Sequence, residues 1–214
     1  NATQGTVQAG STFKPFALAA ALENDISLSD RFSGVNGSTF TFPGFAPYKV
    51  NNFDGYNAGG SISLLRATAA SVNTAYVDLE NQITPEAVVD SAIRAGIPAA
   101  TAGLNAGPTT VLGTSSPHTI DMAAAYATFA ARGLQANPYV IASVRNANGG
   151  LLYSKRPEVT RAFDADIASQ VTYALTQVVK NGSGFAAQDL GRPAAGKTGT
   201  TNSNLSAWFV GYTP

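Results

Sequence analysis

An apolar run near the start of the chain constrains the fold more than any other feature. The segment PFALAAAL, residues 15–22, is apolar on every face of a helix. A helix of that kind is buried on all sides. Proline is tolerated only in the first turn of a helix, so Pro15 places the helix start at or near Ser11. The sequence therefore predicts a buried helix over residues 11–23.

The remaining pattern predicts one α+β domain, without repeats or linkers. Helical patterns with caps cover residues 61–70 (Ser61 as N-cap), 74–82, 84–96, 117–133 and 165–182. Strand patterns flank an Asn-Gly turn at residues 148 and 149, and form a second antiparallel hairpin from residues 193–201 and 206–213, joined by NSNL. Residues 31–60 show little periodicity, and we expect a long irregular connection that borders a binding site.

Composition excludes several classes of function. The 13 basic and 13 acidic residues cancel and form no basic stripe, so we expect no nucleic-acid partner. No apolar run is long enough to span a membrane. The chain has no cysteine, which excludes disulfides, cysteine nucleophiles and thiolate metal sites. Its single histidine, His118, is predicted to lie at a helix N-terminus rather than in a catalytic site.

The segment STFK combines a nucleophile with a base at the start of the buried helix. Residues three apart on a helix have Cβ atoms about 5–6 Å apart, so Ser11 and Lys14 can contact each other. A serine hydroxyl needs a base to become a good nucleophile. A lysine amine can be that base when burial or a nearby cation lowers its pKa. The free N–H groups of the first turn can also stabilise an oxyanion.

Two further motifs follow in order. SVN lies between two helical patterns, where Ser71 is suited to relay a proton and Asn73 to hold a substrate amide. KTGT lies on a strand, so Lys197 and Gly199 share one face and the two threonines share the other. We expect Gly199 to let a substrate approach the backbone closely. Such a strand can pair with an extended peptide, which favours a peptide substrate.

The order, spacing and placement of the three motifs carry more weight than any motif alone. Together with AGGSISLLRATAASVNTAY, LGTSSPHTIDMAAAYATFAARG and GRPAAGKTGTTNSNLSAWFVGYTP, they resemble the transpeptidase domain of class A (bifunctional) penicillin-binding proteins. The resemblance extends over almost the whole chain. It implies a fold like that of penicillin-binding proteins and serine β-lactamases, with a helical cluster packed on an antiparallel sheet. The Ala-rich, weakly charged composition also suggests an actinobacterial source.

The resemblance implies a D,D-transpeptidase that cross-links peptidoglycan stem peptides through a serine acyl-enzyme. Donor D-Ala-D-Ala ends, acceptor amines and covalently bound β-lactams would be its partners, with no metal or cofactor. The location would be extracytoplasmic, on the outer face of the cytoplasmic membrane. The implied roles are Ser11 as nucleophile, Lys14 as base, Ser71 as proton shuttle, Asn73 as donor-peptide contact, Lys197 as electrostatic partner of Ser71, Thr198, Gly199 and Thr200 as substrate-binding residues, and the N–H groups of Ser11 and Thr200 as oxyanion hole.

The chain departs from the family pattern at its ends. Residues 1–214 are expected to be a partial transpeptidase domain, without the glycosyltransferase domain and membrane anchor that lie upstream in the family. Family members also have strands before the first motif, and a strand and a helix after the last one. Without them the terminal hairpin would have bare edges. We expect reduced stability, or completion of the domain by another chain.

Two other functions remain open. Serine β-lactamases carry the same three motifs, and class A enzymes also need a glutamate that activates the deacylating water. The chain has four glutamates, at positions 23, 80, 86 and 158, and none has a context typical of that role. The second alternative is a non-catalytic β-lactam-sensing receptor domain, which is acylated without turnover.

Overall fold

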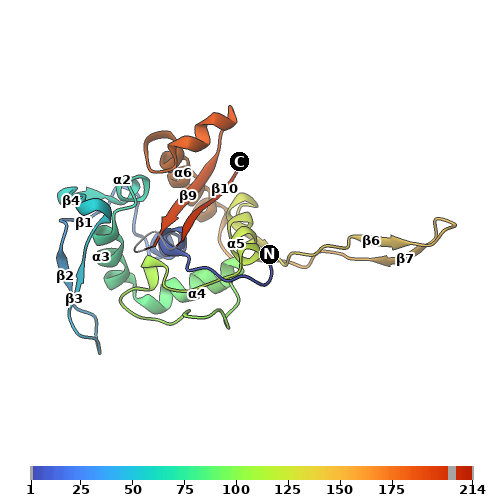
Figure 1. Cartoon of the computed structure of the whole chain (residues 1–214), viewed down its shortest axis with the longest axis horizontal. Coiled ribbons are helices and arrows are strands. Elements are labelled where there is room, and N and C mark those ends of the chain that lie inside the picture. The colour runs from blue at the N-terminus through green and yellow to red at the C-terminus, as the bar shows by residue number, and fades with distance from the viewer. Residues whose placement is uncertain (1, 202–205, 214) are drawn as a thin grey trace.

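The computed structural model describes residues 2–201 and 206–213 of the 214-residue chain (Figure 1). Its α-helices are α1 (Lys14–Glu23), α2 (Leu64–Ala69), α3 (Asn73–Ile83), α4 (Pro85–Ala95), α5 (Thr119–Ala130) and α6 (Ala165–Asn181). Short 3₁₀ helices are η1 (Gly10–Phe13), η2 (Phe53–Gly55), η3 (Thr110–Leu112) and η4 (Phe185–Leu190). No helix in the described ranges is long and apolar enough to cross a membrane.

The predicted buried helix forms the centre of the molecule. Every residue of α1 from Lys14 to Leu22 is buried, and α1 packs against α3, α4 and α6. Its first turn joins a cluster of aromatic rings, in which Phe16 lies edge-on to Phe13 at 4.9 Å between ring centroids. Tyr126 and Phe129 of α5 extend the same cluster. This packing fixes η1 and the start of α1, where the first motif lies.

The predicted terminal hairpin is confirmed. Strands β9 (Ala195–Thr200) and β10 (Ala207–Tyr212) pair antiparallel, with Thr200 opposite Ala207 and Lys197 opposite Val210. The hairpin lies between α6 and α5 (Figure 1), as expected for helices packed on an antiparallel sheet. The joining segment NSNL, residues 202–205, lies outside the described residues.

The prediction for residues 31–63 was wrong in two ways. The supposed irregular connection contains β1 (Arg31–Gly34), β2 (Ser38–Phe40) and β3 (Tyr48–Val50). The supposed helix start at Ser61 is β4 (Gly59–Ser63), which pairs with β1, while β2 pairs with β3. Helix α2 begins only after its N-cap Ser63, whose hydroxyl accepts from the N–H of Arg66. Strands of three to five residues are too short for period-2 alternation to stand out.

A long hairpin arm projects from the body (Figure 1). Strands β6 (Ser143–Arg145) and β7 (Leu151–Ser154) flank the predicted Asn-Gly turn and pair antiparallel. At the base of the arm, β5 (Leu134–Ala136) pairs with β8 (Val159–Arg161). Residues 137–161 are exposed throughout, except for the half-buried Lys155. The arm therefore contributes nothing to the core.

Candidate active site

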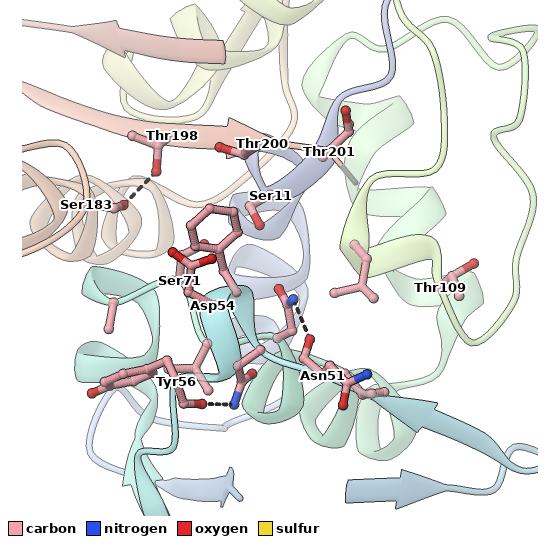
Figure 2. A pocket seen from close by; sticks show the side chains of 18 of the residues that line it. Ser11, Asn51, Asp54, Tyr56, Ser71, Thr109, Ser183, Thr198, Thr200 and Thr201 are labelled. Carbon is pink, nitrogen blue, oxygen red and sulfur yellow. Dashed lines mark hydrogen bonds between the residues drawn. The ribbon is translucent and has the colours of Figure 1, made fainter. Parts of the chain in front are cut away.

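The three sequence motifs meet at one cleft of about 1000 Å³ (Figure 2). Ser11 comes from η1, Ser71 and Asn73 from the junction of α2 and α3, and Thr198 and Thr200 from β9. The segments 48–54, 109–114 and Ser183 form the other walls. Within the described ranges, no three His, Asp or Glu side chains come close enough together to hold a metal ion.

Hydrogen bonds to several segments fix the backbone on either side of Ser11. The N–H of Gly10 donates to the carbonyl of Gly113 at 2.9 Å. The hydroxyl of Thr12 donates to the carbonyl of Ala9 at 2.7 Å, and that of Tyr126 donates to the carbonyl of Thr12 at 2.7 Å. The hydroxyl of Ser11 itself has no hydrogen-bond partner among the described residues. It is therefore available to a ligand in the cleft.

Lys14 is completely buried beneath this serine. Its Nζ donates to the carbonyl of Ser71 at 2.7 Å and to Oδ1 of Asn73 at 2.8 Å, and it lies 3.2 Å from Oγ of Ser71. Burial, and secondly the charge of Lys197, hold the pKa of Lys14 well below its usual range. A neutral amine has two hydrogens and one lone pair. The two donated bonds use both hydrogens, which leaves the lone pair for a hydroxyl proton.

Ser71 occupies a strained turn. Its φ of 58° lies in the left-handed region, which is uncommon for a residue with a side chain. The helix break predicted at SVN is confirmed, because α2 ends at Ala69 and α3 begins at Asn73. The side-chain amide of Asn73 donates to the carbonyl of Asn51 at 2.9 Å. This bond ties the second motif to the wall formed by residues 48–54.

Lys197 approaches Ser71 from the opposite side. Its Nζ donates to Oγ of Ser71 at 2.8 Å and to the carbonyl of Thr198 at 3.1 Å. Burial lowers the pKa of Lys197 to about 7. Two amines with lowered pKa values thus contact one hydroxyl. The Ser71 hydroxyl that accepts from Lys197 can still donate its own proton to Lys14. The three groups thus form a continuous proton path from Lys197 through Ser71 to Lys14.

At Thr198 and Thr200 the backbone of β9 faces the cleft side, where the Thr198 carbonyl accepts from Nζ of Lys197. The N–H of Thr201 donates to the carbonyl of Ser206 on the far side of the hairpin loop. Ladder bonds alternate along an antiparallel pair, so the backbone groups of Thr200 and Thr198 point away from β10. Their side chains line the cleft, as predicted from strand alternation (Figure 2).

Gly199 does not face the cleft, so the predicted close approach of a substrate at this residue is wrong. This glycine is buried and faces η1 rather than the cleft. A Cβ atom there would lie 2.7 Å from the carbonyl oxygen of Ala9 and 2.9 Å from Cγ2 of Thr12. Its missing side chain therefore allows β9 to pack against the turn that carries Ser11.

Sequence reasoning missed Ser183. This residue follows α6 in a Gly-rich turn and lines the cleft. Its hydroxyl lies 2.6 Å from that of Thr198 (Figure 2). The only signal in the sequence is the turn NGSG at residues 181–184. Such turns are common, so contact with β9 could be recognised only in three dimensions.

Glu80 stabilises another wall of the cleft. Its side chain is fully buried on α3, and Oε1 accepts from the N–H of Val111 in η3 at 2.9 Å. Oε2 has no partner among the described residues. Burial raises the pKa of Glu80 to about 8, with a smaller contribution from the charge of Glu86. The neutral acid therefore holds the segment next to Leu112 and Thr109, which line the cleft.

We expect Glu80→Gln to change the pH dependence of stability. The folded pKa of about 8 exceeds the ordinary 4.5, so the folded state binds more protons between these values and stability falls as pH rises through this window. Glutamine cannot ionise and should remove the decline, a difference on the order of 5 kcal/mol above the window. Urea unfolding on both sides of the window would measure it. Glu158→Gln, which removes a carboxyl group from the exposed arm, is the matched control.

Comparisons with known proteins identify the family of the chain. The family model described as "Penicillin binding protein transpeptidase domain" matches residues 1–214. Penicillin-binding protein 1A of Mycobacterium tuberculosis is 35% identical over 232 residues, which cover 99% of this chain and 27% of that protein. The chain thus spans about a quarter of the length of the curated relatives it matches.

Solved structures share the fold. The crystal structure of penicillin-binding protein 1A from Haemophilus influenzae matches with a TM-score of 0.89 and 25% identity, covering 99% of this chain and 37% of that one. The structure of the PonA1 protein from Mycobacterium tuberculosis in complex with penicillin V matches with a TM-score of 0.80 and 34% identity, covering 99% and 58%. The chain belongs to the penicillin-binding protein transpeptidase domain family, and its fold is the fold of that family.

Proposed function

We propose that this chain is a serine D,D-transpeptidase acting on the D-Ala-D-Ala end of peptidoglycan stem peptides. The Ser11 oxygen attacks the penultimate carbonyl, and its proton is transferred to the departing D-alanine. An amine from a second stem peptide then attacks the acyl-serine. An amide forms, the ester bond breaks, and the proton of the amine returns to the serine oxygen.

One observation carries this proposal. Lys14 lies one helical turn from Ser11, fully buried, with its pKa lowered, and its amine contacts Ser71, which also contacts Lys197. A buried amine of this kind is a suitable general base for a serine. The contacts with Ser71 supply a route by which the proton reaches the leaving group. No direct hydrogen bond joins Lys14 to Ser11 here, and contacts of this kind often tighten only when a substrate is bound.

The other site residues take the roles expected from the motifs. Asn73 orients the donor peptide, and Lys197 sets the electrostatic environment of Ser71. Thr198 and Thr200 bind the terminal carboxylate, next to Gly199. The N–H groups of Ser11 and Thr200 form the oxyanion hole, and the free edge of β9 supports this because its Thr200 N–H is not used by β10.

We propose β-lactams as covalent inhibitors, since a related protein has been solved with penicillin V. We also propose an extracytoplasmic site of action, because the substrate is the cell wall. The chain would act as part of a larger, membrane-anchored protein, in line with the fraction of its relatives that it spans.

Labelling with a fluorescent penicillin tests the proposal. We expect a stable one-to-one adduct by intact mass, located on the peptide that contains Ser11. Circular dichroism on the same sample reports whether the chain is folded. A folded chain that forms no adduct would contradict the acyl-serine mechanism.

The lifetime of the adduct and a donor assay separate the alternatives. Hydrolysis within seconds would favour a β-lactamase, although Glu80 is buried outside the cleft lining and Glu23 pairs with Arg94. A stable adduct without any release of D-alanine from a stem peptide would favour the β-lactam-sensing receptor domain.

A further inference from the structure

A carboxylate without a partner lines the same cleft. Asp54 lies in η2, between β3 and β4, and borders the cavity with Ser11 and Ser71 (Figure 2). Among the described residues that line the cleft it is the only acid. Its carboxylate accepts no hydrogen bond and forms no ion pair within the described part of the chain. An exposed acid of this kind is free to bind a ligand.

The turn that carries Asp54 is strained and firmly anchored. Its backbone has φ 49° and ψ 28°, in the left-handed region. Asn52 anchors the turn: its Nδ2 donates to the carbonyl of Tyr56 at 2.9 Å, and its Oδ1 accepts from the N–H of Thr74 at 3.0 Å. Asn52 is itself buried. Strained residues persist where the surroundings fix them, and they concentrate at functional sites.

Asp54 supplies the negative charge among the described residues that line the cleft. Lys14 and Lys197, which contact Ser71, are buried and have lowered pKa values, so they add less positive charge than two ordinary lysines. Lys49 is the other charged residue of the lining, and its side chain runs across Gly37. Lys49 forms no ion pair with Asp54, so the carboxylate is open to an ammonium group that enters the cleft.

We propose that Asp54 binds the ammonium group of the amine that accepts the acyl group from Ser11, an inference that rests on the function proposed above. Asp54 remains a carboxylate throughout. The bound ammonium releases one proton to solvent, and the amine nitrogen then bonds to the acyl carbon. The bond from that carbon to the oxygen of Ser11 breaks, and a second proton passes from the amine to this oxygen.

A comparison of two nucleophiles tests the assignment. The acyl-enzyme is formed from a D-alanyl thioester. Two nucleophiles then compete to react with it: glycinamide, which is a cation at about pH 7, and hydroxylamine, which is neutral there. Asp54→Asn removes the charge, and asparagine still tolerates the left-handed backbone. We expect the rate ratio of glycinamide to hydroxylamine to fall roughly five- to tenfold. Because the ratio is taken within each variant, any general change in acylation cancels.

The matched control is Asp25→Asn. Asp25 is also an exposed acid with a left-handed backbone, φ 60°, but it lies after α1 and outside the cleft lining. Its ratio should equal that of the unmodified chain. Added salt should lower the ratio in the unmodified chain and not in Asp54→Asn, because screening weakens ion pairing.

An unchanged ratio in Asp54→Asn would overturn this assignment while leaving the acyl-serine mechanism intact. Failure of the unmodified, folded chain to form any acyl-enzyme would instead overturn the proposed function, and the role of Asp54 with it.

Discussion

Lys14→Met should lower the rate of acylation by penicillin about 10²- to 10⁴-fold, the usual contribution of a general base. The amine of Lys14 is buried and bonded to Ser71 and Asn73, so the variant removes the buried proton acceptor that lies three residues after Ser11. Methionine has a similar length and no charge. The variant should therefore stay folded, since a buried amine costs free energy that a thioether does not. Stopped-flow or gel-based labelling with a fluorescent penicillin would measure the rate.

The pH profile separates a chemical role of Lys14 from a structural one. Burial lowers its pKa, so the neutral, basic form increases as pH rises through that lowered pKa, and acylation should rise with it. Lys14→Met should lose this rising limb. Lys180→Met, at the exposed end of α6, should keep the rate and the profile, whereas Ser11→Ala should form no adduct at all. A normal rate in Lys14→Met would exclude this lysine as the base.

Gly113→Ala should both destabilise the domain and slow acylation. Gly113 has φ +72°, and a Cβ atom there would lie 2.0 Å from the carbonyl oxygen of Gly10, the residue before Ser11. Neither backbone can move without disturbing η1. We expect a loss of at least about 3 kcal/mol in the free energy of unfolding. A displacement of about 1 Å at the nucleophile would lower acylation by about 10²-fold.

Gly191→Ala provides the matched control. Gly191 has a similar φ of +66°, but a Cβ atom there would have nothing within 4 Å. This variant should lose only about 1 kcal/mol, the cost of the left-handed backbone, and should keep its acylation rate. Urea unfolding and penicillin labelling of both variants separate backbone strain from steric overlap. Equal losses in the two would show that the contact between Gly113 and Gly10 is unimportant.

The main elements of the site could be predicted because their signals are local. The apolar run after Lys14 requires burial, and the caps at Thr84, Pro85 and Gly96 set the limits of α4 as the structure has them. The break at SVN and the strand at KTGT follow from the change in periodicity on either side. The structure brings these three segments, which are distant in the sequence, together at one cleft.

Other features could not be predicted because they arise only from packing. The left-handed backbone of Ser71 depends on the junction of α2 and α3, since serine has no preference for it. The role of Gly199 depends on the approach of η1, and the pairing of Ser183 with Thr198 joins segments 15 residues apart around a turn. Glu80 resembles an ordinary helical surface residue in the sequence. Its burial follows from the contact with η3, which the letters alone do not reveal.

The exposed arm formed by β6 and β7 is a place where the length of the chain can change without a change in the fold. Since residues 137–161 place no side chain in the core, the tip between Asn146 and Gly150 can accept added or removed residues at little cost to the rest. A natural lineage could therefore vary this hairpin freely without altering the chemistry in the cleft. The same tip is a suitable place to insert an epitope or a fluorophore, far from Ser11 along the chain and outside the cleft lining.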